Sequence, residues 1–254
     1  MIKLFKNTRK KLLNEGKTSK YLKYAIGEII LVIIGILVAL QVNNWNTGRI
    51  QNNDSKELSK RLLLETNQNI IILDSQIKRL NKSLNASLEL LKMTGTNYKE
   101  KEIKKTDSLI YEIISTPRFE LNASVLNEAI TTGKVSNMKS DSLKNVIYEF
   151  PSIITTIRVN IGYIDTHDDN FLFPRIYDLI SLRQVDAKFS PNKKELGESN
   201  FPITDNRILL NDIKFESIID NKYFLTNSLL LIYHDTHKKL SILSRLLSKE
   251  IEDN

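Results

Sequence analysis

The sequence has no cysteine, and its eight glycines do not form a glycine-rich phosphate loop. Without cysteine the chain cannot form disulfides, thiolate metal sites or cysteine nucleophiles, although either redox compartment is compatible with this absence. The motifs of serine hydrolases, zinc proteases and kinases are also absent. Because these catalytic motifs are absent, we expect no enzymatic activity. Runs of alternating apolar and polar residues are missing too, so the sequence predicts an all-α protein.

The excess of positive charge is confined to the first 24 residues. These residues carry eight Lys and Arg side chains against Glu15 alone, which accounts for the whole formal charge of +7. The rest of the chain carries 29 basic and 29 acidic residues and therefore lacks the concentrated basic surface that phosphate contacts need. We expect no nucleic-acid binding.

Residues 23–46, KYAIGEIILVIIGILVALQVNNWN, contain a segment long and apolar enough to cross a membrane. From residue 25 to residue 42 the apolar character is interrupted only by Glu28 and Gln41. As a helix, these 18 residues would span about 27 Å, close to the hydrocarbon thickness of a bilayer. The sequence predicts a single transmembrane helix at residues 25–43.

Aromatic side chains mark both ends of this segment, with Tyr21 and Tyr24 before it and Trp45 after it. Such rings favour the headgroup region, so we expect these three residues to contact membrane lipid. The alternative is a cleaved signal peptide followed by a secreted, soluble helical protein. That reading is weakened because ALQVNNWN offers no small-x-small cleavage site and because a 24-residue cationic leader is long for a signal peptide.

The charges flanking the segment predict its orientation. Eight cations precede it, whereas residues 43–57 contain only Arg49 and Lys56. The positive-inside rule therefore predicts an inner-membrane protein with a cytoplasmic leader at residues 1–24 and a periplasmic all-α domain at residues 44–254. The leader is expected to be either a helix lying on anionic lipid or a disordered basic segment that enforces topology.

Small residues repeat along the predicted span. Gly27, Gly35 and Ala39 lie on one face, and the last two fit the small-xxx-small pattern of close helix pairing. Glu28 lies near the start of the span, where the helix dipole and nearby lysines favour a carboxylate. It is interpreted as an interfacial group that sets helix depth or as a contact to a partner helix, so a homo-oligomer or a membrane-protein partner is expected.

The anchor resembles the opening of an uncharacterised family of bacterial single-pass membrane proteins, the type named domain of unknown function 6090. The matching patterns are KYL-YAIGEI-LV-IGIL-AL and Q-NNWN, at residues 20–46. Residues 124–150 are similar to a second family stretch, departing from it at Val135 and Met138. The resemblance implies a membrane location and a helical domain, but no catalytic residues.

Hydrophobic periodicity predicts helices through most of the remaining chain. We expect them at about residues 50–93, 99–115, 121–132, 141–149, 151–169, 172–184 and 221–252, with an exposed loop at residues 186–205. Gly133 is suited to a helix C-terminal cap, and Pro151 to a helix start.

The last helix carries an apolar seam. Its members are Leu225, Leu229, Ile232, Thr236, Leu240, Leu243, Leu247 and Ile251. Such a narrow stripe predicts packing against another long helix, so the domain is expected to be a helical bundle.

The three histidines, His167, His234 and His237, have aspartates beside them. Two imidazoles at His-x-x-His spacing on a helix, with a third histidine and a carboxylate, would complete a zinc shell. On a helical wheel centred on Thr236, however, His237 lies at about 100° and His234 at about 160°, away from the packed stripe. A surface pair is therefore the favoured interpretation of His234 and His237, the three histidines are kept as weak candidates for a metal site, and no cofactor is expected.

Two functions follow from these observations. The preferred one is a membrane-anchored periplasmic helical protein that acts in protein interaction, as a scaffold or in sensing. The alternative is a metal-dependent periplasmic enzyme that uses the three histidines.

Overall fold

The computed structural model describes residues 18–253 of the chain. It divides the chain into two compact units, Met1–Ser55 and Lys56–Asn254. The described residues form helices and no β-strand, so the predicted all-α class is confirmed.

The first described helix, α2, runs without interruption over Thr18–Met93. It contains both the predicted membrane span and the predicted helix at residues 50–93, and it ends where the sequence predicts. Among residues 18–253 it is the one helix long and apolar enough to cross a membrane. Its most apolar 18-residue window has a mean hydropathy of 2.6, and none of that window is buried.

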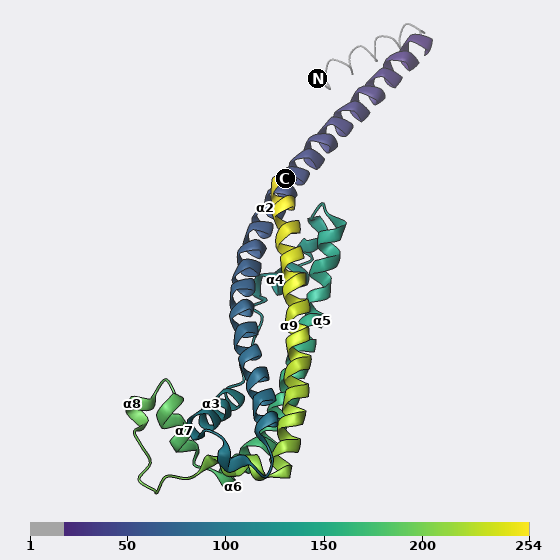
Figure 1. Ribbon diagram of the computed structural model, residues 1–254. Coiled ribbons are helices and arrows are strands. Elements are labelled where there is room, and N and C mark those ends of the chain that lie inside the picture. The colour runs from purple at the N-terminus through teal and green to yellow at the C-terminus, as the bar shows by residue number, and fades with distance from the viewer. Residues whose placement is uncertain (1–17, 254) are drawn as a thin grey trace. The chain divides into compact units, whose positions relative to one another are not determined.

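The second unit is built on three long helices: the part of α2 after residue 55, α5 (Asp141–His167) and α9 (Ile213–Asp253), which lie side by side (Figure 1). Polar contacts give their directions. Asn67 accepts a hydrogen bond from Ser244, and Asp74 pairs with His237, so α9 runs antiparallel to α2. Lys239 pairs with Glu149 in α5, Lys222 contacts Asp168 at the C-terminal end of α5, and Glu250 contacts Ser140 at its N-terminal end. The helix α9 therefore runs antiparallel to α5 as well.

Apolar side chains from the three long helices form one continuous core. From α9 this core takes Leu229, Leu240, Leu243 and Leu247, and Thr236 is buried on the same stripe. The predicted seam of the last helix is therefore confirmed as a packing surface. Burial of leucine side chains contributes about 1.5–3 kcal/mol each, which makes this seam a main source of stability.

The short helix α4 (Ser124–Thr131) packs against α2 through a buried carboxylate. Glu65 accepts hydrogen bonds from the backbone N–H groups of Val125, at 2.8 Å, and Leu126, at 3.1 Å. These N–H groups belong to the first turn of α4, where no intrahelical acceptor exists. After α4, Gly133 has φ 71°, the left-handed conformation predicted for a residue that ends a helix.

A second apolar core lies where α2 ends and α9 begins. It includes Leu90, Ile110, Leu172, Ile176, Val185, Leu209 and Phe215. The elements around it are η1 (Tyr98–Glu100), α3 (Ile103–Ile114), η3 (Asp168–Leu172), α6 (Phe173–Leu179), α7 (Leu182–Phe189) and η4 (Asn206–Asn211). The short helix α8 (Lys193–Leu196) follows α7 and buries none of its residues. Figure 1 shows α7 and α8 standing off from the three long helices.

The predicted break at Pro151 is wrong, because α5 continues through this proline. An interior proline costs a helix about 3 kcal/mol. Ile147 and Phe150 before it and Ile157 after it are all buried in the same core, so tertiary packing outweighs that cost. The helix begins at a Ser140 cap, whose hydroxyl accepts from the Leu143 N–H.

Two other predicted boundaries are also wrong. The helix expected at residues 172–184 is split, because Ile180 is extended and the Ser181 side chain caps a new helix, α7. The predicted loop at residues 186–205 therefore starts inside α7. The last helix begins at residue 213, eight residues earlier than expected, where Asp212 accepts from the N–H groups of Lys214 and Phe215.

Candidate functional site

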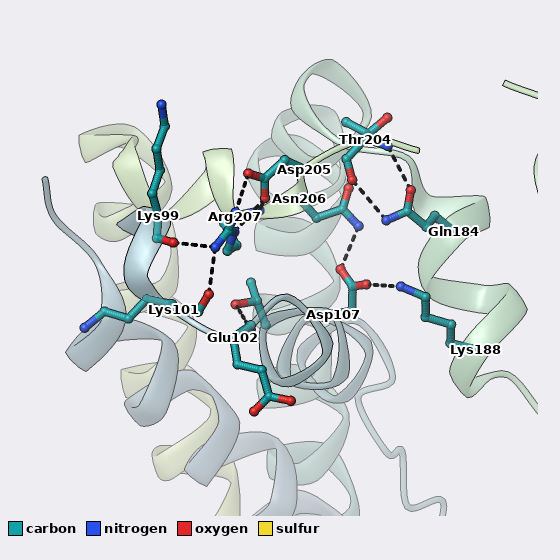
Figure 2. Close-up of polar contacts among 11 residues, drawn as sticks. Lys99, Lys101, Glu102, Asp107, Gln184, Lys188, Thr204, Asp205, Asn206 and Arg207 are labelled. Atoms are coloured by element: carbon teal, nitrogen blue, oxygen red, sulfur yellow. Dashed lines mark hydrogen bonds and ion pairs between the residues drawn. The ribbon is translucent and has the colours of Figure 1, made fainter. Parts of the chain in front are cut away.

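A buried carboxylate, Asp107, organises the region where α3, α7 and η4 meet. It is fully buried, and its two oxygens accept from Lys188 Nζ at 2.7 Å and from Asn206 Nδ2 at 2.8 Å. Figure 2 shows these partners converging on Asp107 from two different elements. A buried carboxylate is stable only when it is paired and hydrogen-bonded, so this contact fixes both α7 and η4 onto α3.

The segment before η4 is held by two further contacts (Figure 2). Gln184 donates to the Thr204 carbonyl and accepts from the Thr204 N–H, both at 3.0 Å. Arg207 binds the Asp205 carboxylate and the backbone carbonyls of Lys99 and Lys101. The hydrogen bonds that Arg207 donates lower the pKa of Asp205, although partial burial opposes the shift. The segment between Lys188 and Thr204 is therefore fixed at both ends, by the contact of Lys188 with Asp107 and by the contact of Gln184 with Thr204.

Between α7 and the segment at residues 198–203 lies a pocket of about 120 Å³. Its lining is Gln184, Ala187, Lys188, Glu198, Ser199, Phe201 and Ile203. Phe201 is 83% exposed and Ile203 is 88% exposed, the two highest values among large apolar side chains of the described residues. Two large apolar side chains thus form the rim of a concave surface that also carries one cation and one anion.

The sequence holds a signal for part of this site. Ile103, Asp107, Ile110 and Ile114 follow helical spacing, so Asp107 stands at an apolar position of its helix. A charged residue there predicts a buried partner. Its partners Lys188 and Asn206, however, lie 81 and 99 residues away in the chain, and no local pattern identifies them.

A second polar cluster is sealed inside the protein at the junction of α5 and η3. Asp168 contacts Lys222 Nζ and lies 3.2 Å from His167 Nδ1, and Lys222 also donates to Thr116 Oγ1 at 2.7 Å. Burial lowers the pKa of Lys222 although Asp168 acts in the opposite direction. The side chains of Lys222, His167 and Asp168 are 0%, 5% and 7% exposed, so this cluster supports the fold and has no access for a substrate.

The three histidines do not come together. His167 adjoins the Lys222 contact, whereas His234 lies twelve residues further along α9, about 18 Å along the helix axis. His234 is exposed, and His237 pairs with Asp74 at 3.1 Å. Within residues 18–253, no group of three or more His, Asp and Glu side chains is arranged to hold a metal ion.

The residues predicted to act in the membrane lie in the first unit. A Cβ built at Gly27 or Gly35 would meet no atom within 4 Å, and Ala39 is exposed while Glu28 is partly buried. Tyr24 and Trp45 are exposed, and the Arg49 guanidinium lies 5.7 Å from the centre of the Trp45 ring. The side chain of Tyr21 and residues 1–17 of the predicted leader lie outside the described part of the chain.

Comparison with known protein families, with curated proteins and with solved structures gave no match to this chain. The resemblance of the anchor to an uncharacterised bacterial membrane family therefore stays a prediction.

Proposed function

We propose that this protein is a membrane-anchored interaction protein that binds a partner protein through the pocket between α7 and residues 198–203. The observation that carries the proposal is the exposure of Phe201 and Ile203 on a segment whose two ends are fixed. A pair of large apolar side chains held in water at a pocket rim is typical of a binding surface.

The size of the pocket favours a protein side chain as its occupant. Cofactor and small-molecule sites usually measure about 300–1,000 Å³. A pocket of about 120 Å³ is close to cavities that hold one benzene ring. One aromatic or branched side chain of a partner would fill it, and Lys188 and Glu198 at the lining would favour a partner with charges of both signs beside that side chain.

We further propose that the N-terminal part of α2 anchors the protein in the inner membrane, with its N-terminus in the cytoplasm and its second unit in the periplasm. The apolar window without buried residues and the eight preceding cations support this orientation. The lack of cysteine makes it directly testable. A Ser199→Cys variant should react with a membrane-impermeant maleimide in intact cells with a permeabilised outer membrane, and an Asn7→Cys variant only after lysis.

Partner binding is tested by photo-crosslinking of the full-length protein in its own membrane. A photoreactive amino acid in place of Ser199, which lines the pocket, should give one discrete adduct whose partner is identified by mass spectrometry. The double substitution Phe201→Ser and Ile203→Ser should abolish that adduct. Phe224→Ser, a matched control at another exposed phenylalanine, should leave it unchanged. An adduct that survives the double substitution, or no adduct at all, would contradict the proposal.

A further inference from the structure

A cavity of about 390 Å³, which we call the α4–α5 cavity, lies between α5 and the chain segment that leads into α4. Its lining includes Glu120, Leu121, Asn122, Asn127, Ile154 and Arg158. Small-molecule sites usually measure about 300–1,000 Å³, so this cavity has the size of a ligand site, unlike the smaller pocket beside Phe201. The polar side chains of the lining are exposed, so a ligand has access from solvent.

The chain segment that forms one wall of the cavity is held in place through its backbone. Burial alternates from Pro117 to Asn122, which is typical of an extended chain. The buried Phe119 N–H donates to the Tyr233 hydroxyl at 2.9 Å. The N–H of Asn122 donates to Asn69 Oδ1 at 2.9 Å, and its carbonyl accepts from Asn69 Nδ2 at 2.7 Å. The wall is therefore preformed, and a ligand would not have to order it.

Two opposite charges in the lining have no partner in the described part of the chain. Arg158 and Glu120 form no ion pair or hydrogen bond with each other or with any other residue from 18 to 253. A neighbouring charge behaves differently, since Arg118 binds Asp165 of α5 at 2.6 Å. The cation and the anion of the α4–α5 cavity are thus available to a ligand that carries both charges.

Carboxylates in two other cavities are already engaged by the protein itself. At the start of α5, Glu250 accepts from the backbone N–H groups of Lys139 and Ser140. At the start of α9, Glu216 accepts from Thr94 Oγ1 at 2.7 Å. These carboxylates hold parts of the fold together, whereas the two charges of the α4–α5 cavity make no such contact.

We propose that the α4–α5 cavity binds a zwitterionic amino acid with an apolar side chain. The Arg158 guanidinium binds the carboxylate of the amino acid through two parallel hydrogen bonds, and the Glu120 carboxylate binds its ammonium group. The side-chain amide of Asn127, which has no hydrogen bond within residues 18–253, supplies a further donor and acceptor. Leu121 and Ile154 are half-buried and pack on the main core, so they form an apolar wall for the side chain of the ligand.

A bound amino acid would connect α5 to α4, which Glu65 holds on α2. Because the ligand binds the folded protein, it should also raise the Tm with increasing concentration. The α4–α5 cavity shares no lining residue with the pocket beside Phe201, and its assignment does not rest on membrane anchoring. The proposal therefore fails separately from those made above.

Isothermal titration calorimetry of the full-length protein in detergent tests the class of ligand. The probe is leucine, and the matched controls are leucinamide, which lacks the carboxylate, and isocaproate, which lacks the ammonium group. Leucine should bind saturably, and each control should bind about tenfold more weakly because it leaves one charge of the cavity unpaired. No saturable binding of leucine up to about 10 mM, or equal affinity for either control, would overturn the proposal.

Variants of the two charged residues test their separate roles. Arg158→Gln should weaken leucine binding about tenfold and remove the preference for leucine over leucinamide, because the carboxylate of leucine has lost its partner. Glu120→Gln should likewise remove the preference for leucine over isocaproate. Arg245→Gln, at an exposed position of α9, is the control and should bind leucine as the native protein does.

Unchanged leucine affinity in Arg158→Gln would show that leucine binds elsewhere and that the α4–α5 cavity is not the site. Circular dichroism of each variant checks that the helices are retained, so that a loss of binding reports on the missing charge.

Discussion

The contact of Lys222 with Asp168 gives a quantitative test of how the second unit is held together. Lys222 comes from α9 and Asp168 from the junction of α5 with η3, and both side chains are buried. We consider two single substitutions, Asp168→Ala and Lys222→Met, and the double variant. Each single substitution leaves one buried charge without its main counter-charge.

The expected loss of folding stability follows from that uncompensated charge. Breaking a buried ion pair on one side typically costs about 3–5 kcal/mol, whereas removing both charges costs much less. The remaining contacts, Thr116 to Lys222 and His167 to Asp168, cannot replace a full opposite charge. The double variant should therefore lose less stability than the sum of the singles, by at least about 2 kcal/mol.

Thermal unfolding of the full-length protein in detergent measures this loss, with near-ultraviolet circular dichroism as a probe of tertiary packing. In a protein of this size, about 3–5 kcal/mol corresponds to a Tm lowered by roughly 6–20 °C. Lys238→Met is the control on the same helix, because the Lys238 and Asp235 side chains are 74% and 77% exposed and their pair should add nothing measurable. The reasoning is refuted if Lys222→Met has the same Tm as the native protein. It is also refuted if the stability lost in the double variant equals the sum of the losses in the two single variants.

Two further predictions concern other buried polar groups. Burial raises the pKa of Tyr233 to about 12, so folding stability should fall as the pH rises from 10.0 to about 12. Tyr233→Phe should remove much of this loss of stability at high pH. At neutral pH the same substitution should cost about 1–3 kcal/mol, because it leaves the Phe119 N–H unpaired. Urea unfolding at both pH values measures the two effects. Glu65→Ala should cost about 1.5–3 kcal/mol for each lost hydrogen bond and accelerate amide exchange at residues 125 and 126; unchanged exchange would contradict its role as the cap of α4.

The sequence by itself determined the features that depend on local composition. Periodicity identified the all-α class and the apolar seam of α9, and Gly133 marked a helix end that needs a left-handed residue. The candidate membrane span is equally a property of one continuous segment. In each case the pattern that predicts the feature lies within one continuous segment of the chain.

Tertiary structure alone decided the features that depend on residues far apart in the chain. Pro151 stays inside α5 because distant core contacts outweigh a local preference, and His167 lies in a buried cluster because Lys222 approaches it from another helix. The pocket beside Phe201 exists because Asp107 binds residues from two later elements. The energy of a buried charge or a packed core depends on which groups come into contact after folding. A local sequence pattern does not identify those contacts.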